Sequence, residues 1–239
     1  MTKASLLALV GVLALGACDR LAAKDDSFDD RVKAYILAHP EVIQEAIEKL
    51  QAKADADDAA QEAKARALLP GLRAAIEHDP RDFVANAGGR ITVTEFYDYR
   101  CAHCINAAPK VLALIASNSD IRFVFKETPI FGPTSDHAAR AAIAIRKAGG
   151  DYLGYYRTMM ATRGLDTATI DRVALASGAA RSDLAGGPEA DKQIADVAAL
   201  FSKLDLGGTP AFIVGGDIIY GEDMDALNAA IDKARAGKS

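Results

Sequence analysis

The feature that most constrains this chain is the motif Cys-Ala-His-Cys at positions 101–104. Residues 91–97 (I-T-V-T-E-F-Y) precede it and are rich in β-branched and aromatic side chains, which predicts a strand. Residues 102–117 are predicted to be helical and residues 121–125 to form the next strand. Such a strand–helix–strand unit implies two parallel strands joined by a crossover. A Cys-x-x-Cys pair beside this unit indicates a thioredoxin-like redox site.

The two cysteines are predicted to have different roles. Cys101 falls at the N-terminus of the helix, where unpaired backbone N–H groups and the helix dipole favour a thiolate. Cys104 lies one turn further along and deeper. We therefore expect Cys101 to be the exposed attacking thiolate and Cys104 the resolving thiol. His103 lies beside both sulfurs. Its imidazole is expected to stabilise the thiolate further, which makes the disulfide more oxidising.

Other uses of the cysteine pair are weaker explanations. A structural disulfide between Cys101 and Cys104 closes a very short loop, so it constrains the unfolded chain little. A structural zinc site needs four ligands, and only two thiols and His103 are present here. Copper(I) accepts two thiolates, so a copper site stays an alternative.

The start of the chain resembles an export signal. A short positive segment, an apolar run over residues 4–15 and the sequence Leu-Gly-Ala-Cys at 15–18 follow one another. The last four residues resemble a bacterial lipobox, which implies cleavage after residue 17, a lipidated Cys18 and a tether over residues 18–27. A plain signal peptide is the alternative. Lipidation leaves Cys101 and Cys104 as a pair in an oxidising compartment.

Composition bears on the partners of the chain. Its formal net charge is −5, from 28 basic and 33 acidic residues, and no basic block stands out. Nucleic acid is therefore not expected as a partner.

The pattern divides the chain into an N-terminal helical region over 28–80 and a second domain over 81–239. In the first region, apolar residues recur at helical spacing on both sides of His39-Pro40. A polar helical stretch follows and is expected to break at Pro70-Gly71. In the second, residues 134–204 are almost wholly helical, and two strands near 211–214 and 218–220 form a hairpin.

The run from Thr94 to Cys104 and the stretch Gly208-Thr-Pro-Ala-Phe212 together resemble the DsbA-like branch of the thioredoxin superfamily. The resemblance implies an α/β thioredoxin fold over residues 81–239 with an inserted helical domain over about 134–204. It also implies a cis Pro210 that, with Thr209, faces the active cysteines and receives the substrate backbone. The family exchanges disulfides with exported proteins and uses no organic cofactor.

Glu95 lies within the strand 91–97, on the face that carries Val93 and Tyr97. The resemblance implies that an acid here lies beneath the disulfide and helps proton transfer from the resolving thiol. Lys126, at the end of the next strand, is a candidate partner for Glu95, and an exposed position at the strand end is the alternative.

The N-terminal region resembles that of the suppressor-of-copper-sensitivity protein C group, in the segment 28–50. This resemblance implies helices that assemble the protein into trimers. An apolar stripe separated from the core by a polar helix also favours packing against a second copy. Folding back onto the catalytic domain is the alternative.

These observations lead to one functional hypothesis and two alternatives. We expect a membrane-anchored periplasmic thiol–disulfide oxidoreductase that acts as an oligomeric isomerase or reductase. Its partner is then a membrane dithiol donor. A monomeric oxidase, paired with a membrane oxidase, is the first alternative, because the sequence does not specify the direction of exchange. A copper(I)-binding lipoprotein is the second.

Overall fold

The computed structural model describes residues 27–237, which divide into two compact units. The first unit ends at Asp55 and the second begins at Ala56. The predicted lipidation site Cys18, the signal peptide and all of the tether except residue 27 lie outside the described residues. Within residues 27–237, no helix combines the length and the apolar character that crossing a membrane requires.

The first unit consists of helix α1 (Phe28–Ala38) and the beginning of helix α2 (Glu41–Glu77). Ser27 caps α1, because its hydroxyl accepts a hydrogen bond from the Asp30 N–H at 3.2 Å. The predicted interruption between the two helices is confirmed. The apolar stripe is exposed in this unit: no residue of α1 is buried, and Ile47 and Leu50 are 60% and 68% exposed.

The second unit is built on a five-stranded sheet in the order β1-β3-β2-β4-β5. The strands are β1 (Phe83–Ala85), β2 (Ile91–Tyr97), β3 (Ile121–Glu127), β4 (Ala211–Val214) and β5 (Asp217–Tyr220). Strands β2 and β3 are parallel, as predicted, and the other neighbours are antiparallel. The sheet order and the hairpin β4–β5 confirm the expected thioredoxin fold.

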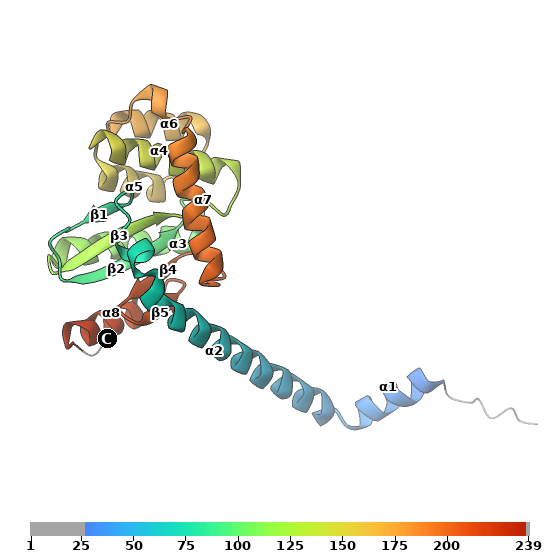
Figure 1. Cartoon of the computed structure of the whole chain (residues 1–239). Helices are drawn as coiled ribbons and strands as arrows, with labels where there is room; N and C mark the ends of the chain where they lie inside the picture. The colour runs from blue at the N-terminus through green and yellow to red at the C-terminus, as the bar shows by residue number, and fades with distance from the viewer. Residues whose placement is uncertain (1–26, 238–239) are drawn as a thin grey trace, which may run out of the picture. The chain divides into compact units, whose positions relative to one another are not determined.

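The remaining helices are α3 (Ala102–Ser117), α4 (Pro133–Ala148), α5 (Tyr152–Ala161), α6 (Thr167–Ala176), α7 (Pro188–Lys203) and α8 (Met224–Arg235). A short 3₁₀ turn, Arg181–Asp183, precedes α7. Helices α4, α5 and α6 group together above the sheet, and α7 runs from that group along the sheet (Figure 1). Together α4–α7 form the helical insertion that the sequence predicts.

The sheet is covered on both faces. On one face, Val93, Tyr97 and Phe125 share a core with residues of α3, α5 and α8. On the other, Phe96 and Ile213 share a core with residues of α2 and α7. Successive strand residues point to opposite faces. The alternation along β2 therefore decides which residues can reach the helix that carries the cysteines.

Helix α2 does not break at Pro70-Gly71, contrary to the prediction. Pro70 lacks the N–H of the helical ladder, but Leu69 and Ile76 on either side of it are buried against the sheet. Tertiary packing therefore lets the helix continue through the proline. As a result, the unit that holds the sheet includes the second half of α2 in addition to residues 81–237.

Candidate active site

The two cysteines follow the end of β2 and lie at the start of α3. Cys101 is the residue that precedes the first turn of α3, and its carbonyl accepts the N–H of Ile105 at 3.0 Å. Its own N–H donates to the carbonyl of Asp98 at 3.2 Å. Cys104 lies one turn further and is fully buried. No disulfide joins Cys101 and Cys104 in this structure.

Asp98 ties the cysteine loop to the segment after β3, a role that no sequence signal indicated. Its carboxylate is buried and accepts four hydrogen bonds. The donors are the backbone N–H groups of Arg100, Ile130 and Phe131 and the hydroxyl of Ser135, at 2.7, 2.7, 3.1 and 2.8 Å. Because Ser135 belongs to α4, this single side chain joins the loop before Cys101 to the start of the helical insertion.

The loop before β4 lies against the attacking cysteine. The Thr209–Pro210 peptide bond is cis, as predicted, and Cys101 Sγ lies 3.0 Å from the carbonyl oxygen of Thr209. Cys101 is only 3% exposed. The expectation of an exposed Cys101 is therefore wrong, because the loop at Thr209 lies against the sulfur.

The surroundings of the two cysteines separate their pKa values. The pKa of Cys101 is lowered to about 5, first by a hydrogen bond from the Cys104 thiol and then by the side chain of Thr209 and the backbone N–H groups of Cys104 and His103. Burial raises the pKa of Cys104, and the neighbouring Cys101 and Glu95 raise it further. Cys101 is thus the thiolate at neutral pH, and Cys104 keeps its proton.

Glu95 lies on the same face of the sheet as the buried cysteine, as predicted. Its carboxylate oxygens both lie 3.3 Å from the hydroxyl of Tyr156, which the helical insertion supplies. Burial raises the pKa of Glu95 to about 8, and the charges of Glu127 and Cys101 add to the rise. The hydrogen bond from Tyr156 opposes it.

Lys126 does not contact Glu95, so the predicted pairing is wrong. In the register of the parallel pair, Glu95 lies beside Phe125 and Lys126 lies beside Phe96, on the opposite face. There Lys126 is buried, pairs directly with the carboxylate of Asp82 and donates to the carbonyl of Ala75 at 2.5 Å. Lys126 therefore joins α2 to the sheet and is not part of the surroundings of the cysteines.

A second buried carboxyl, Glu127, was missed in the sequence. It accepts hydrogen bonds from the hydroxyls of Tyr97, Tyr152 and Tyr99, at 2.5, 2.6 and 3.3 Å. Burial raises its pKa to about 8, and these tyrosines oppose the rise. The alternation along residues 121–127 could have revealed it, because Glu127 shares a face with Phe123 and Phe125.

Replacing Glu127 with glutamine is expected to flatten the pH dependence of stability. A carboxyl whose pKa rises from 4.5 in the unfolded chain to about 8 in the folded one stabilises the protein below pH 4.5. That contribution is lost as the pH rises through 8, by up to about 4 kcal/mol. Urea unfolding of the oxidised protein at pH 4.5 and 8.5 measures this change while the cysteines do not titrate.

The raised pKa of Glu95 makes the free energy of unfolding decline over the same pH range. Glu127→Gln should therefore lose about half of the decline in the free energy of unfolding that the wild-type protein shows. The exposed Glu189→Gln variant serves as the matched control and should keep all of it. Equal declines in the two variants would contradict the assignment of Glu127 as a buried, protonated acid.

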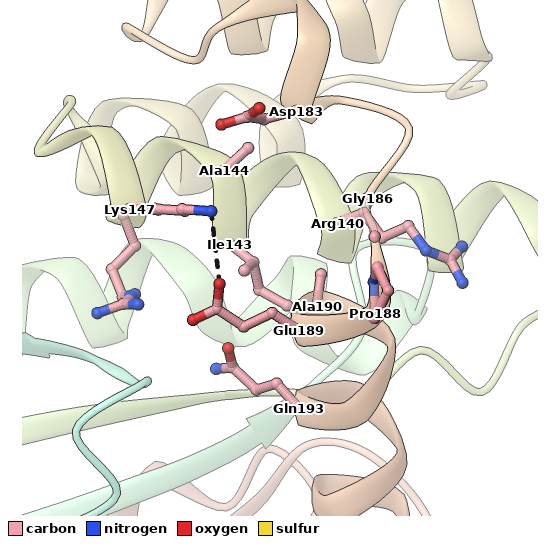
Figure 2. A pocket seen from close by; sticks show the side chains of 12 residues that line it. Arg140, Ile143, Ala144, Lys147, Asp183, Gly186, Pro188, Glu189, Ala190 and Gln193 are labelled. Atoms are coloured by element: carbon pink, nitrogen blue, oxygen red, sulfur yellow. Dashed lines mark hydrogen bonds and ion pairs between the residues drawn. The ribbon is translucent and has the colours of Figure 1, made fainter.

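The helical insertion contains a hollow of about 230 Å³ between α4 and α7, shown in Figure 2. Two of its three cations are paired with carboxylates: Arg140 with Asp191 at 2.9 Å, and Lys147 with Glu189 at 3.4 Å. The third, Arg146, donates to the carbonyl of Pro80 at 3.1 Å, and its buried Nε has no hydrogen-bond partner among the described residues. None of the predicted site residues lines it. The hollow is therefore separate from the chemistry of the cysteines.

No group of three or more His, Cys, Asp or Glu side chains within residues 27–237 is placed to hold a metal ion. The copper(I) alternative therefore depends on the two sulfurs alone. Since burial raises the pKa of Cys104, copper(I) would have to displace a tightly held proton.

Comparison with known proteins identifies both units. Residues 92–232 match the family of the DSBA-like thioredoxin domain, and residues 26–56 match the copper resistance protein ScsC N-terminal domain. A solved thioredoxin-like oxidoreductase from Silicibacter pomeroyi is 34% identical, with a TM-score of 0.63, over 69% of this chain and 98% of that chain. Proteus mirabilis ScsC in a transitional conformation is 25% identical, with a TM-score of 0.66, over 86% of this chain and 94% of that one.

A curated relative with a different name also matches. The Na(+)/H(+) antiporter NhaA 3 of Salinispora tropica is 30% identical over 186 residues, which are 72% of this chain and 28% of that protein. This chain thus spans less than a third of that relative.

Proposed function

Since the chain belongs to the family of the DSBA-like thioredoxin domain and carries an N-terminal domain of the ScsC type, we propose that it is a periplasmic thiol–disulfide oxidoreductase that acts as an oligomeric disulfide isomerase or reductase. The observation that carries the proposal is the contrast between the two thiols: Cys101 ionises near pH 5 against the cis Thr209–Pro210 loop, and Cys104 stays protonated above Glu95.

In the first step, the Cys101 thiolate attacks a sulfur of a substrate disulfide. A Cys101–substrate disulfide forms, the substrate's S–S bond breaks, and the other substrate sulfur leaves as a thiolate that takes a proton from water. In isomerisation, a substrate thiolate then attacks the mixed disulfide and releases Cys101. In reduction, Cys104 attacks Cys101 and releases the second substrate thiolate, and the pair is oxidised by two electrons.

The second step needs a base for the Cys104 proton, and Glu95 is the proposed base. The negative charge of the Cys101 thiolate raises the pKa of both Glu95 and Cys104. Formation of the mixed disulfide removes this charge. Both groups therefore become more acidic when Cys104 must react. Tyr156 stabilises the ionised carboxylate of Glu95 by its hydrogen bond.

Self-association through the first unit supports the choice of isomerase. The exposed side chains of Ile47 and Leu50 lie within the segment that matches the ScsC N-terminal domain. Several active sites in one assembly can hold a misfolded chain while its disulfides rearrange. A trimer joined through these helices is the proposed assembly, and a lipidated Cys18 is the proposed anchor to a membrane.

The test is the thiol state of Cys101 and Cys104 in cells, trapped by acid quench and mass tagging, together with refolding of scrambled ribonuclease. A mainly reduced pair and restored ribonuclease activity are the expected results. A mainly oxidised pair in cells would favour the disulfide-donating oxidase instead.

A substitution in the first unit tests the proposed assembly separately. Ile47→Glu should lower the molar mass in light scattering to that of a single chain and reduce isomerase activity, with insulin reduction unchanged. Gln44→Glu places the same charge one turn earlier on the same helix and should leave the mass unchanged. A wild-type protein that is already monomeric would contradict the proposed trimer.

A further inference from the structure

The side chain of His103 is held by a residue outside the cysteine motif. Its Nδ1 lies 3.3 Å from Oε1 of Glu222, with the side chains 67% and 35% exposed. Since a carboxylate only accepts hydrogen bonds, this contact places the proton on Nδ1. The imidazole therefore directs a donor at Glu222.

Glu222 is placed by the same loop system that holds the cis-proline. It lies in the turn between β5 and α8, and the N–H of the preceding Gly221 donates to the carbonyl of Pro210 at 2.8 Å. Gly221 has a φ of +71°, a conformation that favours glycine. The turn thus contacts the cis-proline loop through the N–H of Gly221 and the first turn of α3 through the carboxylate of Glu222.

The imidazole of His103 is not among the groups that contribute most to the low pKa of Cys101. Those groups are the Cys104 thiol, the Thr209 side chain and two backbone N–H groups, one of which belongs to His103 itself. The sequence predicted that the imidazole stabilises the thiolate. In the structure, the backbone N–H of His103 lowers the pKa of Cys101, and the imidazole Nδ1 contacts the carboxylate of Glu222.

We infer that Glu222 is a positioning residue that holds the His103 imidazole away from Cys101 and thereby makes the disulfide less oxidising. An imidazole N–H directed at Cys101 would stabilise the thiolate and so the reduced form, which raises the reduction potential. The pairing with Glu222 withholds that donor. The inference rests on the proposed function, because a less oxidising couple is one that a reductase or isomerase requires.

The test is the glutathione equilibrium of the full-length protein. In it, the Cys101–Cys104 disulfide and two glutathione thiols give the dithiol and one glutathione disulfide, with the transfer of two electrons. Glu222→Gln removes the carboxylate charge and keeps the side-chain size. We expect its equilibrium to shift toward the dithiol by roughly two- to five-fold, the size of effect that a single exposed contact with a charged side chain has. That shift equals a rise in potential of about 10–20 mV.

Two matched variants separate this mechanism from others. Asp225→Asn removes one negative charge in the next helix and should leave the equilibrium unchanged. In a His103→Ala background, Glu222→Gln should also produce no shift, because the imidazole is absent. Thiolate absorbance against pH should show the Cys101 transition at lower pH in Glu222→Gln.

Three results would overturn the inference: no shift in Glu222→Gln, an equal shift in Asp225→Asn, or an equal shift without His103. Each of these leaves the proposed function standing, provided that the wild-type protein exchanges disulfides. A wild-type protein that does not equilibrate with glutathione would overturn both.

Discussion

Replacing Cys101 with serine is expected to abolish insulin reduction and ribonuclease refolding, a loss of about three orders of magnitude or more. The reason is that the thiolate is the nucleophile, and a serine hydroxyl at this position stays protonated at neutral pH. Insulin turbidity and recovery of ribonuclease activity measure the loss. Cys18→Ser is the matched control, because it removes a thiol outside the redox pair and should leave both activities unchanged.

Cys104→Ser should have a different effect from Cys101→Ser. The attacking thiolate remains, although it loses the hydrogen bond from the Cys104 thiol that lowers its pKa most. Mixed disulfides through Cys101 should therefore accumulate, because the internal thiol that resolves them is gone. Non-reducing gels and mass spectrometry detect them. Substrate trapped through Cys104 in the Cys101→Ser variant would reverse the two roles.

Replacing Lys126 with methionine is expected to lower the free energy of unfolding by about 3–5 kcal/mol. Lys126 and Asp82 are both buried and paired with each other, and the other carboxylate oxygen of Asp82 has no partner. Removal of the cation leaves a buried carboxyl without its compensating charge. Such a loss is a large part of the stability of an ordinary domain. Urea unfolding followed by circular dichroism measures it.

The loss should depend on pH. Burial raises the pKa of Asp82 from 3.8 to about 6, and Lys126 opposes the rise. Without Lys126 the folded pKa is higher still, so the penalty is small near pH 4, where the folded protein keeps this carboxyl protonated with or without Lys126. It grows as the pH rises toward 8.

Two further variants control for the loss of packing. The double variant Asp82→Leu/Lys126→Met should recover most of the stability, because apolar residues of similar volume replace a buried ion pair at little cost. Lys110→Met changes an exposed lysine and should have almost no effect. A double variant as unstable as Lys126→Met would show that packing, rather than the unpaired carboxyl, causes the loss.

Local patterns predicted much of this fold and site. The β-branched run at 91–97, the helix after Cys101 and the hairpin at the C-terminal end each depend on neighbouring residues, and the structure contains all of them. The cis Pro210 followed from resemblance instead of residue physics.

What the sequence could not supply depends on contacts between distant segments. Lys126 was paired with the wrong acid because strand register, which decides the face of each side chain, appears only when β2 and β3 are aligned. Helix α2 continues through Pro70 because the sheet packs against it. Tyr156 and Glu222 reach the site from positions 61 and 119 residues from their partners, a distance at which no local pattern gives a signal.

The contact between Cys101 Sγ and the carbonyl of Thr209 creates a reciprocal linkage. A thiol can donate to that carbonyl, but a thiolate cannot. Loss of the proton therefore leaves an acceptor without a donor beside the cis-proline, at the place where a polypeptide would present its own backbone N–H. A docked chain that fills this acceptor favours the ionised sulfur, and the ionised sulfur favours docking by the same factor. Because the pKa of Cys101 is lowered to about 5, this linkage acts at acidic pH, where part of the sulfur still holds its proton, and at neutral pH the free enzyme already presents the ionised nucleophile.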